Sequence, residues 1–373
     1  MTDKMISVPQ MQPCLGKEEA DAVYKVVESG WITEGAESEK FSRQLNKMIG
    51  CDYGVFAPNG TLALYLGLVA MGIGVGDEVL VPDTTFIASA NAVIMAGATP
   101  VFVDVNRRNF QIDVADATKY LSNKTKAIMP VHLYGMIANM SEVMEFSSTH
   151  DLLVIEDAAQ ALGVHYKGQH SGTFGDVGCF SFFADKTMTT AEGGYVVCQT
   201  EETYKKLLYL RNQGRLDRGS FVHPEIGYNF RITDMHAAMG LVQLKKLNWI
   251  IQRKHEIYSW YREQLETQKA ITFLEIEPGS EFVPFRTVVL AERLEALMEY
   301  LNNNGVGTRG FFYPLHKQPC YQYMVEEGRD LSDENYPNAT YGNKHGLCLA
   351  TFPTLEREQV DHVCKMINDF YSR

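Results

Sequence analysis

From residue 59 onward, apolar helix-like stretches alternate with short runs rich in β-branched residues. Four such runs occupy 78–81, 100–103, 127–131 and 152–155. Strands that are apolar along their length are typical of parallel sheets, because crossover helices bury both faces of such a sheet. The alternation therefore predicts an α/β fold with a mostly parallel central sheet.

Further elements and a change of pattern near residue 254 predict how the chain divides into domains. A short helix is expected at 17–29, two further strands at 179–182 and 195–198, and a helix at 234–251. From about Lys254 the helices become longer and more amphipathic and the strand runs become shorter. We therefore expect a large domain at 1–253, including the N-terminal helix, and a smaller α+β domain at 254–373. No long Pro/Gly/Ser linker separates them, so close packing of the two is expected.

Charge and composition exclude several function classes. The 34 Lys and Arg against 46 Asp and Glu give a net charge of −12, which argues against binding to nucleic acid or to an anionic membrane. The longest apolar run, 62–75, is interrupted by glycines and is shorter than the roughly 20 residues that cross a bilayer. The seven cysteines form no Cys-x-x-Cys pair, and the N-terminus lacks the pattern of a secretory signal. These features predict a cytoplasmic protein, and no metal-binding signature is present.

Lys186 lies in a threonine-rich turn between two apolar strand-like runs, and Gly193 and Gly194 follow it. A lone lysine is usually a solvated surface charge. In this setting, however, the amine could be partly desolvated, which would lower its pKa and free it to form a Schiff base. Lys186 is therefore a candidate catalytic residue.

The apolar run 152–155 is followed by two carboxylates, Glu156 and Asp157, and then by Ala158, Ala159 and Gln160. In open α/β sheets, ligands bind at the carboxyl ends of the strands, where this residue would lie. An aspartate in that position can equally well cap the next helix. The spacing alone does not decide between a ligand contact and a helix cap.

Three further segments carry polar groups next to apolar ones. Asn59, Gly60 and Thr61 precede an apolar helix, so they could bind a phosphate or simply cap that helix. His132 lies in an apolar run and could be either a core residue or a site residue. Arg309 and His316 flank a cluster of aromatic residues, which would suit an anionic substrate that carries a ring.

In this order, the motifs resemble the DegT/DnrJ/EryC1/StrS family over nearly the whole chain. The resemblance is carried by Asn59-Gly60-Thr61, Phe86, Glu156 to Gln160, Ser181 to Lys186, Glu192-Gly193-Gly194 and Gly227 to Arg231. Members of this family are enzymes of the aspartate aminotransferase fold (fold type I) that use pyridoxal 5′-phosphate (PLP) and act on nucleotide-linked keto-sugars. The resemblance therefore implies a PLP-dependent aminotransferase that serves deoxyamino-sugar and polysaccharide biosynthesis.

The same resemblance implies a role for each matching residue. Lys186 would carry the cofactor as a Schiff base, and the carboxylate of Asp157 would pair with the pyridine nitrogen. The remaining residues of the cofactor site would be Asn59, Gly60, Thr61, Phe86, Ala159, Gln160, Ser181 and, from the neighbouring subunit of a homodimer, Asn229.

The expected reaction moves an amino group from L-glutamate to C4 of a nucleotide-linked 4-keto-6-deoxyhexose. Lysine at 186 favours amino transfer, since members with histidine there act as dehydratases. GDP-4-keto-6-deoxymannose is the first choice of acceptor; a UDP-linked 4-keto-6-deoxy-N-acetylhexosamine or a dTDP-keto-sugar is the alternative. The expected substrate contacts are Trp31, His316, Arg309 and Arg215, the last in the loop 215–218.

The chain departs from the family pattern at three positions, and one alternative function of another class is considered. The chain has Ala184-Asp185 and Ala191 where relatives often have Gly-Asn and Gly. A non-catalytic binding or regulatory protein with the same fold is the alternative from another class, and the presence of both Lys186 and Asp157 argues against it.

Overall fold

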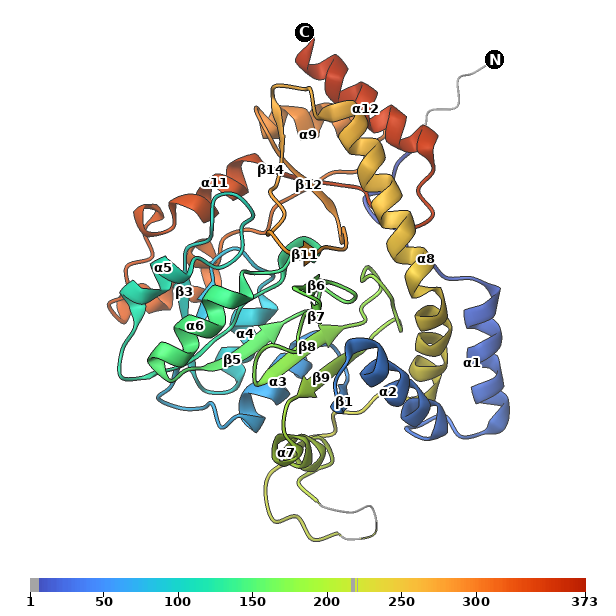
Figure 1. The fold of residues 1–373 in the computed structure, drawn as a ribbon, viewed down its shortest axis with the longest axis vertical. Coiled ribbons are helices and arrows are strands. Elements are labelled where there is room, and N and C mark those ends of the chain that lie inside the picture. Colours follow the sequence, from blue (N-terminus) through green and yellow to red (C-terminus); the bar gives the residue numbers. More distant parts are fainter. Residues whose placement is uncertain (1–6, 216–218, 220) are drawn as a thin grey trace.

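A seven-stranded sheet forms the centre of the protein, which the computed structural model describes at residues 7–215, 219 and 221–373 (Figure 1). The strand order is β1-β9-β8-β5-β4-β2-β3. The five strands from β8 to β3 are parallel, whereas β9 runs antiparallel to both β8 and β1. The bounds are β1 Tyr53–Ala57, β2 Glu78–Pro82, β3 Thr99–Val103, β4 Thr125–Ile128, β5 Leu153–Asp157, β8 Val177–Ser181 and β9 Gly194–Cys198. The structure thus confirms the α/β class with a mostly parallel sheet.

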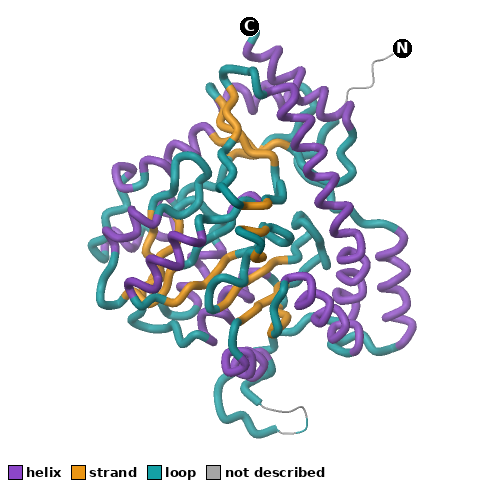
Figure 2. Tube along the Cα trace, viewed as in Figure 1, coloured by secondary structure: helices purple, strands orange, loops and turns teal. Residues whose placement is uncertain are grey.

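Helices cover both faces of this sheet, as Figure 2 shows. Neighbouring strand residues point to opposite faces, so Ile155 belongs to the core that includes residues of α3, α4 and α7, whereas Val154 belongs to the core that includes residues of α2, α6 and the first half of α8. The bounds of these helices are α2 Ala36–Ile49, α3 Gly60–Ala70, α4 Ala88–Met95, α6 Met140–His150, α7 Glu201–Arg211 and α8 Asp234–Leu265. None of the described helices is long and apolar enough to span a membrane.

A second sheet, of order β10-β12-β14-β13, lies in the C-terminal part. Helices α9 and α12 and the end of α8 share a core with it, and Val8 near the N-terminus joins that core. The bounds are β10 Ile271–Phe273, β12 Thr287–Ala291, α9 Leu294–Asn303, β13 Arg309–Gly310, β14 Gly346–Leu349 and α12 Arg357–Tyr371. The remaining α-helices and strands are α1 Lys17–Ser29, α5 Val114–Ala117, β6 His165–Tyr166, β7 Gln169–His170, β11 Ser280–Glu281, α10 Tyr323–Glu326 and α11 Pro337–His345.

Two expected elements end more than two residues away from the end that the structure shows. Helix α8, expected to end at Ile251, continues to Leu265, because Ile257, Tyr261 and Leu265 extend its buried face at four-residue spacing. The helix therefore runs without a break past residues 253 and 254, where the sequence predicts the domain boundary. The division into two domains stays a prediction.

Strand β4 ends at Ile128, although the sequence predicts a strand to Val131. Pro130 has no N–H to donate to a neighbouring strand, so the regular ladder stops before it. The chain still follows β5 there, since the N–H of Asp157 donates to the carbonyl of Pro130 at 2.9 Å.

Candidate active site

Lys186 and Asp157 meet at the carboxyl edge of the central sheet. Asp157 is the last residue of β5, and Ser181 is the last residue of the adjacent parallel strand β8. Lys186 follows in the loop to β9, and the charges of Lys186 and Asp157 each affect the pKa of the other. The fold therefore brings together two candidates that lie 29 positions apart in the sequence, at the edge where open α/β sheets bind ligands.

The environment of Lys186 favours its neutral form. The side chain is half-buried, and its Nζ lies 5.1 Å from the centre of the Phe285 ring. Burial lowers the pKa of Lys186; the carboxylates of Asp185 and Asp157 oppose this shift, and Arg286 and Arg309 add to it. A neutral amine is the form that attacks a carbonyl carbon, so the site provides a nucleophile.

Asp157 does not cap a helix, which resolves the alternative left open by the sequence. No helix begins within the residues after it. Its Oδ1 accepts from the N–H of Ala159 at 3.1 Å, and its Oδ2 accepts from the hydroxyl of Ser89 at 2.7 Å. Burial raises the pKa of Asp157, and the bonds from Ser89 and Ala159 partly offset that rise.

A buried carboxylate of this kind calls for a cationic partner. Within residues 7–215, 219 and 221–373, no Lys, Arg or His nitrogen lies within ion-pair distance of Asp157. The position thus suits a bound ligand with a protonated nitrogen.

Ser89 is a site residue that the sequence did not indicate. It lies on α4 in a run of small residues, is fully buried, and bonds both Asp157 and the hydroxyl of Thr85, which lies 2.9 Å away. Thr85 immediately precedes Phe86. The chain Thr85–Ser89–Asp157 therefore links the carboxylate to the segment that carries the candidate aromatic residue.

Replacement of Ser89 by alanine should raise the pKa of Asp157 further, because the carboxylate loses a hydrogen bond that stabilises its charged form. We expect kcat/KM to fall about 5- to 30-fold, and the acidic limb of its pH profile to move up by about one unit. Thr85→Val is the matched control, since it removes only the outer hydroxyl and should have a smaller effect. An unchanged acidic limb in Ser89→Ala would contradict this role.

The N-terminus of α3 offers donors for an anion. The side chain of Asn59 caps the helix by accepting from the N–H of Leu62 at 3.0 Å. In the described part of the chain, the N–H groups of Gly60 and Thr61 have no acceptor. A Cβ at Gly60 would lie 2.8 Å from the Cβ of Ser181, so glycine lets the helix approach that hydroxyl. Asn59 thus caps the helix as one alternative predicted, while the free N–H groups and Ser181 form a site suited to a phosphate.

Three residues lie around this edge of the sheet. Phe86 is 54% exposed, and its ring centre lies 5.8 Å from that of Phe312. The amide of Gln160 accepts from the N–H of Tyr134 at 2.7 Å, which leaves its NH₂ group for other partners. Ala159 follows Ala158 after β5. The exposed ring of Phe86 suits a flat ligand.

Three other predicted residues lie elsewhere in this chain. Trp31 is exposed between α1 and α2, where its indole N–H donates to the carbonyl of Glu34 at 3.4 Å. Arg215 and Asn229 lie in the segment between α7 and α8. Residues 216–218 of the predicted substrate loop lie outside the described residues.

His316 serves the fold itself. Its Nδ1 lies 2.6 Å from Asp83 and its Nε2 lies 3.1 Å from Asp333, and its ring stacks on Tyr336. The imidazole is buried and both nitrogens have partners, so neither is free for the substrate contact that we expected. Burial by itself would lower the pKa of His316, but the carboxylates of Asp83 and Asp333 together outweigh burial, so the pKa is raised. This cluster anchors residues 315–317 to the end of β2.

His132 is a buried core residue, the structural alternative that the sequence left open. Its Nε2 lies 2.8 Å from Glu156, which also accepts the N–H groups of Gly172, Phe174 and Gly175 at 2.7 Å each. The pair thus fixes the strand that ends in Asp157. The glycine at 194 also serves the fold, since a Cβ there would lie 2.3 Å from the carbonyl oxygen of Asn59.

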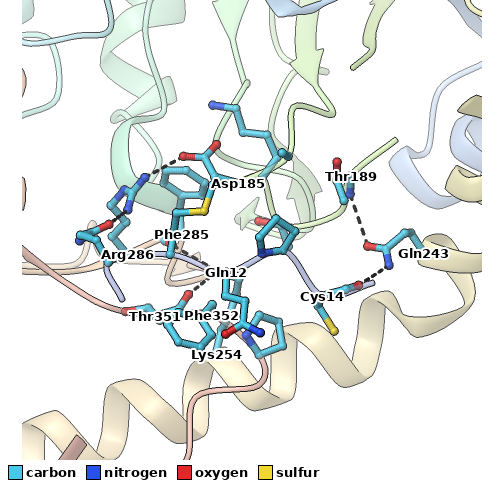
Figure 3. Close-up of a pocket in the computed structure, with 17 residues that line it drawn as sticks. Gln12, Cys14, Asp185, Thr189, Gln243, Lys254, Phe285, Arg286, Thr351 and Phe352 are labelled. Atoms are coloured by element: carbon cyan, nitrogen blue, oxygen red, sulfur yellow. Dashed lines mark hydrogen bonds and ion pairs between the residues drawn. The ribbon is translucent and has the colours of Figure 1, made fainter. Parts of the chain in front are cut away.

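Asp185 and Arg286 form a second cluster beside Lys186 that the sequence did not indicate. An Nη of Arg286 lies 2.7 Å from Oδ2 of Asp185, and Figure 3 shows this pair next to Phe285. Arg309 lies on β13, is half-exposed, and approaches the same Oδ2 at 3.9 Å. Arg309, predicted as a substrate contact, therefore lies close to Lys186.

Lys254 is buried on α8 and lines the pocket of Figure 3 together with Lys186 and Arg286. Its Nζ donates to the carbonyl groups of Pro284, Phe285 and Thr351 at 3.3, 3.1 and 2.9 Å. Burial lowers the pKa of Lys254 to about 7, and repulsion from Arg286 adds to this shift. The amine therefore releases its proton in the folded protein near neutral pH.

This low pKa predicts a pH-dependent stability. Between about pH 7 and the ordinary pKa of 10.5, the unfolded chain holds the proton of Lys254 and the folded chain does not, so the free energy of unfolding rises with pH. Relative to Lys254→Met, the wild-type value should rise by roughly 2–3 kcal/mol between about pH 7.5 and about pH 9.5. Urea unfolding at both pH values measures this difference, and two parallel pH profiles would contradict it.

Comparison with known proteins agrees with this geometry. The profile of the DegT/DnrJ/EryC1/StrS aminotransferase family matches residues 13–368. A GDP-perosamine synthase of Escherichia coli O157:H7 is 39% identical over 98% of this chain and 99% of its own length.

Solved structures show the same fold. DesV of S. venezuelae, solved in complex with a ketimine intermediate, matches with a TM-score of 0.90 at 32% identity over 95% of both chains. A protein of Streptococcus pneumoniae, Spr1654, described as a sugar aminotransferase in its PLP form, matches with a TM-score of 0.92 at 28% identity, over 98% of this chain and 99% of the other.

Proposed function

Because the chain belongs to the DegT/DnrJ/EryC1/StrS aminotransferase family, we propose that it transfers an amino group from L-glutamate to C4 of GDP-4-keto-6-deoxymannose with PLP as cofactor. The observation that carries the reaction class is the position of Lys186, whose pKa is lowered by burial, at the same edge of the sheet as the buried carboxylate of Asp157. The choice of acceptor is supported by the 39% identity to a GDP-perosamine synthase over nearly the full length.

The residues at the sheet edge fit PLP. Its phosphate suits the free N–H groups of α3 and the hydroxyl of Ser181, and its pyridine nitrogen suits the unpaired carboxylate of Asp157. Phe86 offers a face for stacking on the ring, with Ala159 and Gln160 nearby. When bound, PLP supplies a ring that accepts the electrons left on a carbon that has lost a proton.

The protein supplies the proton transfers. Lys186 would hold the cofactor covalently, and its free Nζ would take the proton from Cα of glutamate. In the second half of the cycle, the same Nζ returns a proton to the carbon that becomes C4 of the amino-sugar. The charge of Asp157, which the hydroxyl of Ser89 stabilises, would favour the protonated form of the ring nitrogen. One lysine thus serves as carrier, base and acid, and the kinetics should be ping-pong.

A homodimer with shared sites is part of the proposal. Asn229 is exposed and lies close in sequence to Phe221, Val222 and Ile226, whose side chains are 86%, 72% and 85% exposed. Exposed apolar residues of this kind support an interface. From there Asn229 would reach the cofactor of the partner, and Trp31 and Arg215 would reach its sugar nucleotide. The free state of all seven cysteines supports a reducing cytoplasm.

The proposal is tested with purified protein loaded with PLP. Addition of L-glutamate should shift the visible absorption of the cofactor to that of the pyridoxamine form, with one equivalent of 2-oxoglutarate released. A panel of GDP-, UDP- and dTDP-linked 4-keto sugars then identifies the acceptor, and nuclear magnetic resonance locates the new amine. Activity with only the UDP- or dTDP-linked sugar would show that this sugar, and not the GDP-linked one, is the acceptor. Transfer only to 3-keto sugars would refute C4 as the position of the new amine. A loaded protein that converts no donor would support the non-catalytic alternative.

A further inference from the structure

Asp185 lies between two arginines that differ in their surroundings. Arg286 is closed off: its side chain is 5% exposed, it bonds Asp185 and the amide oxygen of Gln10, and its guanidinium lies beside the Phe285 ring. Arg309 is open: its side chain is 48% exposed, and it reaches Asp185 only at 3.9 Å. The two guanidinium groups share one carboxylate oxygen, but only Arg286 is close enough to form a hydrogen bond with it.

The donor groups of Arg309 are available for a ligand. Across residues 7–215, 219 and 221–373, its guanidinium donates no hydrogen bond. A guanidinium binds a carboxylate through two parallel hydrogen bonds, which makes it the preferred protein partner of that group. Arg309 also lies close enough to Lys186 to lower the pKa of that lysine. A carboxylate on a molecule that reacts at Lys186 would therefore meet Arg309.

We propose that Arg309 binds a carboxylate of the amino-acid donor, and that Asp185 is the internal counterion of Arg309 when the carboxylate-free sugar occupies the site. This inference rests on the proposed function, because only a transaminase must accept both molecules at one place. Without Asp185, the charge of Arg309 would be unopposed in the second half of the cycle. The sequence predicted that Arg309 contacts a substrate; the present inference specifies that this substrate is the amino-acid donor.

The inference predicts that Asp185 competes with the donor. Asp185→Asn removes the charge but keeps an oxygen that can accept from Arg286, so the fold should be preserved. Glutarate carries the two carboxylates of glutamate without an amine, so it binds without reacting. Calorimetry of glutarate binding to the PLP-loaded protein should give a Kd about two- to fivefold lower in Asp185→Asn than in the wild type, the size expected for one exposed ion pair. Asp185→Glu, which keeps the charge, is the matched control.

A double-mutant cycle shows whether the effect passes through Arg309. Arg309→Gln should raise the Kd of glutarate about tenfold or more, the size expected for a lost bidentate pair. In that background, Asp185→Asn should change nothing further. GDP is the second probe, since a role of Arg309 toward the diphosphate would shift the Kd of GDP instead.

Several results would overturn the inference. These are an unchanged glutarate Kd in Asp185→Asn, an effect that persists in Arg309→Gln, a shift for GDP in place of glutarate, and no measurable glutarate binding by any variant. If Asp185→Asn does not fold, the response of Arg309→Gln to glutarate and to GDP still decides. The proposed function fails separately, if the wild-type protein transfers no amino group from glutamate.

Discussion

Replacement of Lys186 by alanine is expected to lower turnover by more than about 10⁴-fold, the largest effect of any single substitution in this protein. The substitution removes the group that holds the cofactor covalently and also the base and acid that move its protons. The phosphate site at α3 and the carboxylate of Asp157 remain, so part of the affinity for PLP should be retained. Steady-state kinetics with L-glutamate and the keto-sugar measure the loss, and equilibrium dialysis measures the retained PLP.

The loss should be specific to the amine. Lys47→Ala, a substitution of an exposed lysine in the last turn of α2, is the matched control and should leave turnover unchanged. A small primary amine such as methylamine should restore part of the activity of Lys186→Ala, because it can enter the space left by the side chain and take the Cα proton. Substantial turnover by Lys186→Ala without added amine would refute the role assigned to this lysine.

Replacement of Asp157 by asparagine should give the second largest effect, a fall in kcat of about 10²–10³-fold. Asparagine keeps the shape and can still bond Ser89, but it has no charge with which to hold a proton on the pyridine nitrogen. Asp157 is only 5% exposed, so solvent water cannot take over the stabilising effect of the lost charge. The effect should appear in both half-reactions, each followed by the absorption of the cofactor in a single turnover.

Two further measurements separate this role from a structural one. Asp157→Glu keeps the charge and should retain more activity than Asp157→Asn, although its longer side chain displaces the carboxylate. The thermal unfolding temperature of the protein without cofactor should not fall in Asp157→Asn, because removal of an uncompensated buried charge does not destabilise the fold. Equal activity of the two variants would exclude a role for the charge.

Motifs with a local physical reason are recognisable in the amino-acid sequence itself. The apolar runs at 78–81 and 152–155 are strands, and Asn59 caps the helix that follows it. Lys186 and Asp157 stand out because each follows or separates apolar strand-like runs, and the carboxyl ends of neighbouring parallel strands meet at one edge. The expected strand at 127–131 was wrong beyond Ile128, although Pro130 is a visible signal for its end.

Contacts between distant residues are not recognisable in this way. His316 bonds Asp83, 233 positions earlier, and Asp185 bonds Arg286, 101 positions later. Ser89 bonds Asp157 across 68 positions and lies in a run of small residues that gives no local signal. Arg286 stands out at most as a charge that precedes the apolar strand β12.

The sequence by itself determined the α/β class, several strands and helices, and the two residues expected to perform the chemistry, because periodicity and strand-end position are local properties of the chain. The tertiary structure alone decided which carboxylate each cation meets: His316 meets Asp83 and is occupied, whereas Arg309 stays open beside Asp185. The physical reason is that a hydrogen bond or ion pair requires its two atoms within a few ångströms of each other. Between segments more than 100 positions apart, that distance depends on the packing of the whole core and not on any local pattern.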